Sequence, residues 1–157
     1  LDLAFVSAPD RFPANIDMRM LSEEPMLFVC RPDHHLAQRD YVGIPELADE
    51  ELIGFPHEFG LRRLVEDAFS AAGIASRTPY EVAVDYSLAA GLVRHGLGTI
   101  FMPAGEADRF PDLHAVAVRP ALGWTIYLAS AGQAQIGPAS AKLVELLLAS
   151  ADATTTP

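Results

Sequence analysis

The residues best suited to chemistry lie in one short stretch, His57-Glu58-Phe59-Gly60, which runs into a predicted helix at Leu61 and Arg62. The first turn of a helix carries unpaired backbone N–H groups and the positive end of the helix dipole. Such an end attracts anions, and a nearby arginine can add a charge-assisted hydrogen bond to a carboxylate. The stretch therefore predicts a site for a small anion. The alternative is a solvated loop with its arginines on the outer helix face, which the helical spacing favours more for Arg63 than for Arg62.

Residues at the ends of predicted strands form a second group of candidates. Asp85 follows a strand and begins a helix, so its carboxylate is suited to capping that helix. Phe101 and Met102 end the next strand, where they belong either to the wall of a pocket or to the core. Val6 and Ser7 end the first strand, and the Ser7 hydroxyl can donate a hydrogen bond to a ligand.

Motifs for other chemistry do not occur in the sequence. His34 and His35 are adjacent and lack the spaced carboxylates or cysteines typical of zinc sites, and His57-Glu58 lacks the second histidine of a zinc protease. There is no Gly-x-Ser-x-Gly nucleophile elbow and no phosphate-binding Gly-Lys-Ser/Thr. Cys30 is the single cysteine, which we interpret as a small buried hydrophobe. We therefore predict no catalytic residue, no metal site and no cofactor.

The stretch from Asp85 to Pro103 indicates how the candidates are positioned. Apolar residues recur there at helical spacing and form one stripe: Tyr86, Ala89, Ala90 and Val93. Gly96 suits the end of this helix. Residues 99–102 are apolar on both faces, which is typical of a strand covered on both sides in a parallel α/β sheet, and Pro103 ends it.

Helices and strands alternate along most of the chain. The clearest helix is predicted over 60–73, with apolar residues at helical spacing and Gly73 as its stop. The other predicted elements are strands at 1–6, 16–20, 26–30, 52–55, 80–84, 113–118 and 124–129, a helical turn at 45–49 and a helix at 138–150. Pro25 is expected to separate the strands at 16–20 and 26–30. The alternation predicts α/β layers with helices on a mainly parallel sheet.

Composition limits the class of protein. The chain has 157 residues, of which half are hydrophobic, and a formal net charge of −10 from 11 basic and 21 acidic residues. This suffices for one sizeable core or two small lobes. An acidic surface repels phosphate backbones, so we do not expect this chain to bind nucleic acid by itself. No apolar run reaches the length of a membrane span, no signal-peptide pattern occurs, and the start inside a strand leads us to expect further chain upstream.

A series of short motifs resembles the LysR-type transcriptional regulators. The matching residues are Leu1-Asp2-Leu3-Ala4-Phe5, Glu24-Pro25 before a strand, Asp33-His34 with Leu36-Ala37, Pro45-Glu46-Leu47-Ala48, Gly60 to Phe69 with Ala72-Gly73-Ile74, and Gly91-Leu92-Val93 with Gly96-Leu97-Gly98. The resemblance covers the chain to about Ser150. His35 departs from it, because the family usually has proline at this position.

The resemblance implies a periplasmic-binding-protein-like α/β fold, with two Rossmann-like subdomains and an effector site in the cleft between them. Segments 40–55 and 116–124 are expected to cross between the subdomains. The outer subdomain, incomplete here, would comprise 1–52 and 119–150, the inner one 53–118, and 151–157 would be a disordered tail. The resemblance also implies that a winged helix-turn-helix, its linker helix and the first part of the outer subdomain precede this chain.

We therefore predict a cytoplasmic, non-enzymatic effector-sensing domain of a LysR-type regulator. It would bind a small anionic molecule, form a homo-oligomer (dimer or tetramer), and contact DNA only through the preceding winged helix-turn-helix. The predicted effector-binding residues are Val6, Ser7, His57, Phe59, Gly60, Leu61, Arg62, Asp85, Phe101 and Met102. Two alternatives stay open: a solute-binding protein of a transport system, favoured by an upstream secretion signal, and an enzyme on a two-lobed fold, favoured by turnover of a bound ligand.

Overall fold

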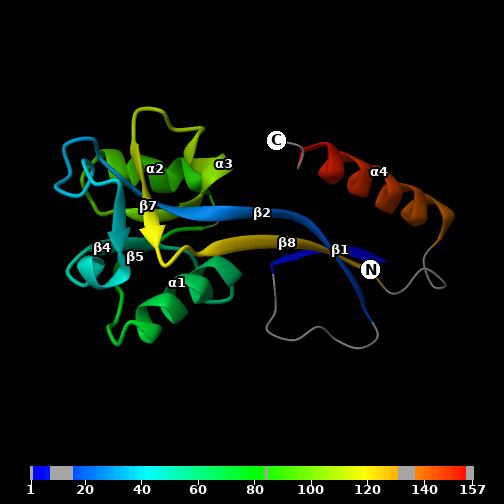
Figure 1. The fold of residues 1–157 in the computed structure, drawn as a ribbon, viewed down its shortest axis with the longest axis horizontal. Coiled ribbons are helices and arrows are strands. Elements are labelled where there is room, and N and C mark those ends of the chain that lie inside the picture. Colours follow the sequence, from blue (N-terminus) through cyan, green and yellow to red (C-terminus); the bar gives the residue numbers. More distant parts are fainter. Residues whose placement is uncertain (1, 8–15, 84, 131–136, 155–157) are drawn as a thin grey trace. The chain divides into compact units, whose positions relative to one another are not determined.

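The structure is a computed structural model that describes residues 2–7, 16–83, 85–130 and 137–154 (Figure 1). It forms two compact units. Unit 1 comprises Leu1–Glu23 and Trp124–Pro157, and unit 2 comprises Glu24–Gly123. The predicted loop at 8–13 lies outside the described residues. Among the described residues, none of the helices has both the length and the apolar character needed to span a membrane.

The chain crosses between the two units at positions that differ from the predicted crossings between subdomains. The chain passes from unit 1 to unit 2 after Glu23, earlier than the predicted crossing at 40–55. It returns after Gly123, inside the predicted crossing at 116–124. The first passage occurs within one long strand, which the sequence pattern had divided. The assignment of 1–52, 53–118 and 119–150 to outer and inner regulatory subdomains stays a prediction.

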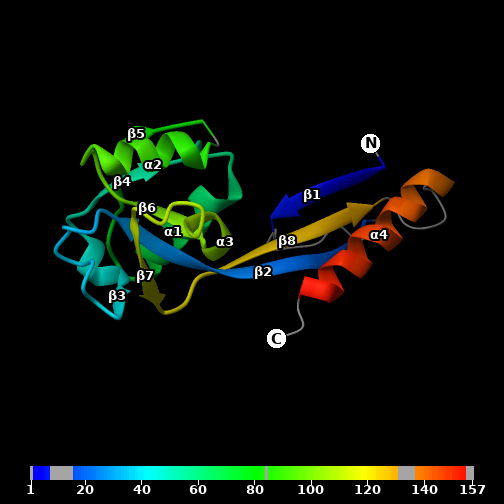
Figure 2. The same cartoon turned by 90° about the horizontal axis from the view of Figure 1, so that it is seen from above.

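Unit 2 contains most of the helices and short strands. Its elements are the second part of β2 (Asp17–Cys30), β3 (Tyr41–Gly43), a 3₁₀ turn (Ile44–Leu47), β4 (Glu51–Gly54), α1 (Gly60–Ala71), β5 (Arg77–Glu81), α2 (Tyr86–Arg94), β6 (Ile100–Pro103), α3 (Ala104–Ala107) and β7 (His114–Arg119). The short elements β3 and α3 were not predicted, and β5 begins three residues before the predicted strand at 80–84. α2 lies beside β4 (Figure 2).

The sheets of unit 2 mix parallel and antiparallel pairs. β2 is antiparallel both to β6, with Met26 opposite Pro103, and to β7, with Leu27 opposite Ala117. β3 is parallel to β7, and β4 is parallel to β5. The prediction of a mainly parallel sheet is therefore wrong for the sheet that contains β2. An apolar pattern on both faces of a strand indicates that both faces are covered. It does not indicate whether the neighbouring strands are parallel or antiparallel.

β2 continues through Pro25, so the predicted break at this residue is also wrong. Proline lacks the N–H that a central strand donates to its neighbours, and it is tolerated where that donor is not needed. Pro25 lies next to the position where the chain passes from unit 1 to unit 2. β2 adjoins β8 in the strand order, and its pairing with β6 and β7 begins after Pro25, at Met26 and Leu27.

The predicted helices over 60–73 and 85–96 are confirmed. α1 buries one stripe, Leu61, Val65 and Phe69, and Gly73 after it has a φ of +74°, which glycine adopts at low cost. The Asp85 side chain caps α2 by accepting hydrogen bonds from the N–H groups of Ser87 and Leu88, at 2.8 and 3.2 Å. This confirms the capping interpretation of Asp85.

The core of unit 2 is built around aromatic rings. Phe28, on β2, is fully buried and its ring packs edge-on against Phe101, which in turn packs against Phe69. Beside this core, the loop before β6 approaches β4 closely. Gly98 has a φ of +150°, and a Cβ there would lie 2.5 Å from the carbonyl oxygen of Glu51. Only glycine fits this approach without displacing the backbone.

Unit 1 is a smaller assembly of strands and one helix. β1 (Leu3–Ser7) is antiparallel to β8 (Gly123–Ser130), with Leu3 opposite Ser130, and α4 spans Pro138–Thr154. α4 extends four residues into the predicted disordered tail, to Thr154. Residues 155–157 lie outside the described residues.

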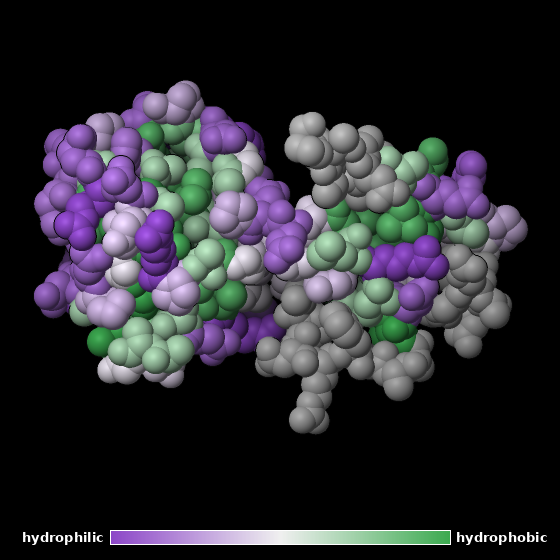
Figure 3. Space-filling view, viewed as in Figure 1, coloured by the Kyte–Doolittle hydropathy of each residue, from purple (hydrophilic) through white to green (hydrophobic). Residues whose placement is uncertain are grey.

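Unit 1 leaves large apolar side chains in contact with solvent. Phe5 is 64% exposed, Met20 56% and Leu146 57%. Figure 3 shows apolar surface on this unit. The contrast with the fully buried rings of unit 2 is the main difference between the two units.

Candidate functional site

The loop between β4 and α1 has a helix start without a capping side chain. Phe59 is the N-cap residue of α1, with an extended backbone, and its side chain makes no capping hydrogen bond. Within the loop, the Phe59 N–H donates to the Pro56 carbonyl at 2.9 Å. The first backbone N–H groups of α1 are therefore not covered by a side-chain acceptor at the N-cap, which is the condition for binding an anion at a helix start.

Two other helices of unit 2 begin differently. Asp85 covers the start of α2, and the carboxylate of Glu24 accepts a hydrogen bond from the Gly105 N–H at the start of α3, at 2.8 Å. Both helix starts are thus already occupied by an acidic side chain of the protein. Among these three helices, α1 has the N-terminus that is best suited to an external anion.

An aromatic cluster lies beside the start of α1. The Phe55 ring packs edge-on against Phe59, at 5.6 Å between ring centroids, and against Tyr86 at 5.1 Å. Burial raises the pKa of Tyr86, with smaller contributions from the Glu106 and Glu24 carboxylates, so its hydroxyl stays protonated and can donate a hydrogen bond. The sequence pattern places Tyr86 in the apolar stripe of its helix, and Phe55 is not among the predicted site residues. The only available signal was that each lies next to a predicted site residue.

Arg62 points into unit 2 and away from the solvent. Its side chain is 11% exposed, its Nε donates to the Glu66 carboxylate at 2.6 Å, and its Nη1 is buried without a hydrogen-bond partner among the described residues. A Cβ on Gly54 would overlap this Nη1, so the guanidinium lies directly against the β4 backbone. The neighbouring Arg63 is exposed.

A small cavity lies beneath the Arg62 guanidinium. Its volume is about 20 Å³, which is room for one water molecule and not for an organic effector. Leu61 and Phe101 line it together with Gly54 and Thr78. The structure thus brings Leu61, Arg62 and Phe101 together, on the inner side of α1. Direct contact of Leu61 and Phe101 with an effector stays a prediction.

The other predicted site residues are more dispersed. Met102 is fully buried opposite Leu27 in the sheet, where it belongs to the core. His57 is mostly exposed, and its Nδ1 lies 3.6 Å from the Glu66 carboxylate that also binds Arg62. Val6 and Ser7 belong to unit 1, where they are half-buried opposite Tyr127 and Ile126 of β8. Their participation in one site with α1, and that of Asp85, stays a prediction.

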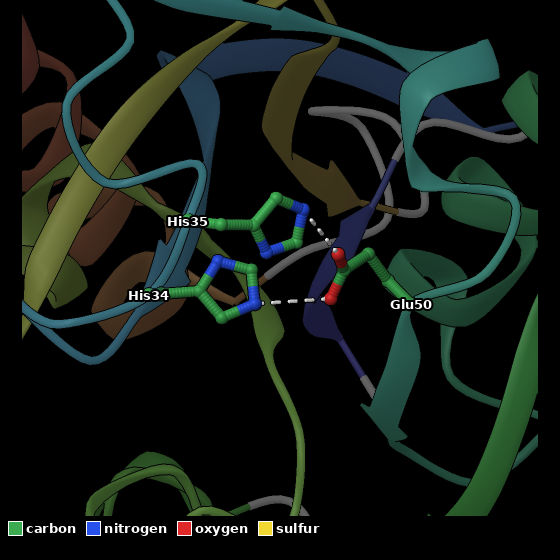
Figure 4. Close-up of side chains that lie close together, drawn as sticks. All are labelled: His34, His35 and Glu50. Atoms are coloured by element: carbon green, nitrogen blue, oxygen red, sulfur yellow. Dashed lines mark hydrogen bonds and ion pairs between the residues drawn. The ribbon is translucent and has the colours of Figure 1, made fainter.

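A cluster of charged and titratable groups lies at the other end of β4. His34 Nε2 lies 3.1 Å from one carboxylate oxygen of Glu50, and His35 Nε2 lies 3.4 Å from the other (Figure 4). Cys30 is fully buried nearby. Burial raises its pKa to about 11, and the Glu50 and Asp33 carboxylates contribute further, so the thiol is protonated at neutral pH.

Comparisons with known proteins agree on one family. The family model described as LysR substrate binding domain matches residues 1–152. The chain is 29% identical over 138 residues to the uncharacterized HTH-type transcriptional regulator YbhD of Escherichia coli K12. That match covers 86% of this chain and 43% of YbhD, so the chain spans less than half the length of this relative.

Solved structures give the same result for the fold. The effector binding domain of QuiR in complex with shikimate is similar with a TM-score of 0.82 and 27% identity, over 96% of this chain and 72% of that one. The CcmR regulatory domain of Synechocystis PCC6803 has a TM-score of 0.81 over 96% of this chain and 73% of that one; at 19% identity, this likeness shows the fold alone. The predicted periplasmic-binding-protein-like α/β fold class is thereby confirmed.

Proposed function

Because the chain belongs to the family of LysR substrate-binding domains, we propose that it is the effector-sensing part of a DNA-binding transcriptional regulator. The family match over residues 1–152 carries this proposal, since it leaves almost none of the chain for another role. The DNA-binding part is a winged helix-turn-helix outside this chain. A net charge of −10 supports this division, because it opposes contact with phosphate backbones.

The regulator acts as a homo-oligomer in the cytoplasm, and effector binding changes how its subunits pack. A ligand can shift such an equilibrium only by binding one arrangement more tightly than the other. The effector therefore prefers one arrangement of the sensing domains and, through it, one spacing of the DNA-binding domains.

The effector is a small carboxylic acid whose acidic group binds at the start of α1. Two features support this class. The QuiR domain, at 27% identity, is described in complex with shikimate, which is a carboxylate. The α1 start has no capping side chain, and the exposed His57 and the aromatic cluster of Phe55, Phe59 and Tyr86 lie beside it. Phe59, Gly60 and Leu61 contribute backbone N–H groups and apolar contact.

Arg62 supports this site by neutralising Glu66. The Glu66 carboxylate lies between Arg62 Nε, at 2.6 Å, and His57 Nδ1, at 3.6 Å. Without Arg62, its negative charge would face the same region as the incoming carboxylate and would repel it. The inward orientation of Arg62 and the water-sized cavity below it favour this indirect role over direct contact with the effector.

The sensing domain leaves its effector chemically unchanged. The relatives are described as transcriptional regulators, which disfavours both the transport and the enzyme alternatives. A thiol-based sensor is disfavoured as well, because a buried cysteine with a pKa of about 11 has almost no reactive thiolate at neutral pH. The test is recovery of the bound acid after prolonged incubation with the protein, where any product would contradict a purely sensing role.

Calorimetric titration of the full-length protein with a panel of small carboxylic acids, shikimate included, tests the proposal. We expect at least one acid to bind at one site per chain. Arg62→Ala should weaken that binding about tenfold, in the range of a charge-assisted interaction. Adding Glu66→Gln should restore most of the loss, because it removes the unpaired charge.

Arg63→Ala is the matched control, since it removes an equally charged, exposed neighbour. It should leave the affinity unchanged. If Arg62→Ala also leaves the affinity unchanged, Arg62 has no part in the site. If Glu66→Gln fails to rescue it, Arg62 contacts the acid directly. Absence of binding by every acid in the panel would overturn the proposed effector class.

A further inference from the structure

Two adjacent histidines and one glutamate of unit 2 direct their donor atoms to a common point. His34 and His35 lie in the turn after β2, and Glu50 directly precedes β4. Figure 4 shows both rings presenting Nε2 to the Glu50 carboxylate, one to each oxygen. One ligand atom from each of the three residues lies within 4.8 Å of the others.

These donor types and distances suit a divalent transition-metal ion. Imidazole nitrogen and carboxylate oxygen bind Zn²⁺ at about 2.0–2.2 Å, so neighbouring ligands of a tetrahedral site lie about 3.3 Å apart. The observed separations are 3.1 Å for His34 Nε2 to Glu50 Oε2 and 3.4 Å for His35 Nε2 to Glu50 Oε1. Each imidazole is therefore already close to the required spacing from one oxygen of Glu50, and one ligand atom from each of the three residues lies within 4.8 Å of the others.

Two of the three ligands are held firmly and the third is free to adjust. The His34 and Glu50 side chains are 20% and 12% exposed, and the His34 ring packs against Phe28. The His35 side chain is 69% exposed. The remaining adjustment, which brings the two Nε2 atoms closer together, thus falls on the side chain that moves most freely.

A bound metal would change one hydrogen bond. The Leu36 N–H donates to His34 Nδ1 at 3.3 Å, so the neutral ring carries its proton on Nε2 when no metal is bound. Metal binding at Nε2 requires the neutral ring to carry its proton on Nδ1 instead, so Nδ1 no longer accepts from the Leu36 N–H and this contact is given up. This contact is long for a hydrogen bond, so its loss opposes metal binding only weakly.

The surroundings favour a cation with one open coordination position. A hollow of about 260 Å³ adjoins the cluster, and its lining includes His34, Glu50, Asp49 and Glu51. Arg31, also in the lining, has its charge engaged by Asp33, at 2.8 and 2.6 Å. With three protein ligands, the fourth position of a zinc ion faces water in this hollow. The buried Cys30 is not among the residues whose ligand atoms lie within 4.8 Å of one another.

We propose that His34, His35 and Glu50 form a binding site for a divalent transition-metal ion of the zinc class, separate from the effector site. His35 is the residue that departs from the family resemblance, and it supplies the third ligand. The prediction of no metal site rests on the absence of a zinc-type set of carboxylates or cysteines at short spacing after the histidines. The turn and the intervening strand bring Glu50, fifteen residues after His35, to the two rings.

Titration of the untagged full-length protein with Zn²⁺ alone, in the absence of effector, tests this site. We expect one ion per chain, and absorption bands of tetrahedral Co²⁺ without a thiolate charge-transfer band when Co²⁺ replaces Zn²⁺. His35→Ala should weaken Zn²⁺ binding by more than about 100-fold, since loss of even an outer-sphere partner costs 10–100-fold. His34→Ala and Glu50→Gln should abolish it.

His35→Ala decides the outcome, because this exposed side chain is not needed for folding. His57→Ala is the matched control, since His57 also faces a carboxylate, that of Glu66, but without a second histidine. It should leave Zn²⁺ binding unchanged. Absence of Zn²⁺ binding by the unaltered protein, or equal affinity in the His35→Ala protein, would overturn the proposal. Equal weakening by His57→Ala would show non-specific binding and would overturn it too.

Discussion

The two compact units bury their apolar side chains to very different degrees. In unit 2, large residues such as Phe28, Phe55 and Phe69 are at most 1% exposed. In unit 1, Phe5, Met20 and Leu146 are more than half exposed, and the buried apolar residues among those described are Leu128, Ala129 and Val144. Burial of apolar area is the dominant stabilising contribution to folding. Unit 2 therefore contains most of the stability of the chain.

The comparison is tested most strongly by one phenylalanine in each unit. Phe28→Ala removes a fully buried ring that contacts Phe101 and His34, and it should cost about 3–5 kcal/mol of unfolding free energy. Phe5→Ala removes a ring that is 64% exposed, and it should cost no more than about 1 kcal/mol. Urea unfolding of both variants measures the difference, and equal losses would break the comparison.

Two glycines test how closely unit 2 is packed at the backbone. Gly98→Ala places a Cβ against the Glu51 carbonyl at a φ of +150°, and it should cost about 1–3 kcal/mol. Gly91→Ala lies inside α2 with nothing within 4 Å of the new Cβ, and it should stabilise the protein by up to about 1 kcal/mol. Thermal unfolding of the two variants measures whether each substitution raises or lowers the stability of the protein. Destabilisation by Gly91→Ala would mean that the surroundings of α2 are tighter than described.

Alkaline pH should weaken unit 2 through Cys30. The thiol has a pKa of about 11 in the folded protein, against an ordinary value of 9.0, so folding favours its protonated form. The resulting stability is fully present below pH 9 and is lost as the pH rises through about 11. The unfolding free energy should fall over this range, and Cys30→Ala should flatten part of the decline. Parallel curves for both proteins would exclude this contribution.

The smallest effect concerns a helix start. Asp85→Ala removes the cap of α2 and should cost about 1 kcal/mol, measured by urea unfolding, with faster hydrogen exchange at the Ser87 and Leu88 amides. Asp85→Asn keeps an acceptor and should cost little. If exchange instead rises equally in α1, which has no such cap, then Asp85 stabilises unit 2 as a whole and not one helix.

Local patterns in the sequence predicted the helices and most strands correctly, because spacing and glycine stops act within one element. Gly73 and Gly96, each with a positive φ after its helix, were identifiable for that reason. The direction of strand pairing and the continuation of β2 through Pro25 depend on which segments become neighbours. No residue in β2 indicates which segments become its neighbours, so the predictions of a mainly parallel sheet and of a break at Pro25 were wrong.

The same distinction applies to the candidate site, where features within one element could be predicted and contacts between distant segments could not. The start of α1 was predictable as a site because helix starts have the same unpaired N–H groups everywhere. The inward orientation of Arg62 was not, since it depends on space above Gly54 and on Glu66. The contact of Phe55 with Tyr86, and that of Glu50 with His34 and His35, join residues that are distant in the sequence. Such contacts become visible only when the chain is folded.

The order of the two units along the chain has a consequence for biosynthesis. Unit 2 is one uninterrupted segment, Glu24–Gly123, so all of it leaves the ribosome before Trp124. Unit 1 consists of two segments that are distant in the sequence. Because Leu3 pairs with Ser130, β1 cannot complete its pairing until the end of β8 has been synthesised. Pairing at such separation is slow and exposes apolar strands in the meantime. The nascent chain can therefore complete its well-packed half first, while β1 has no strand partner until β8 emerges.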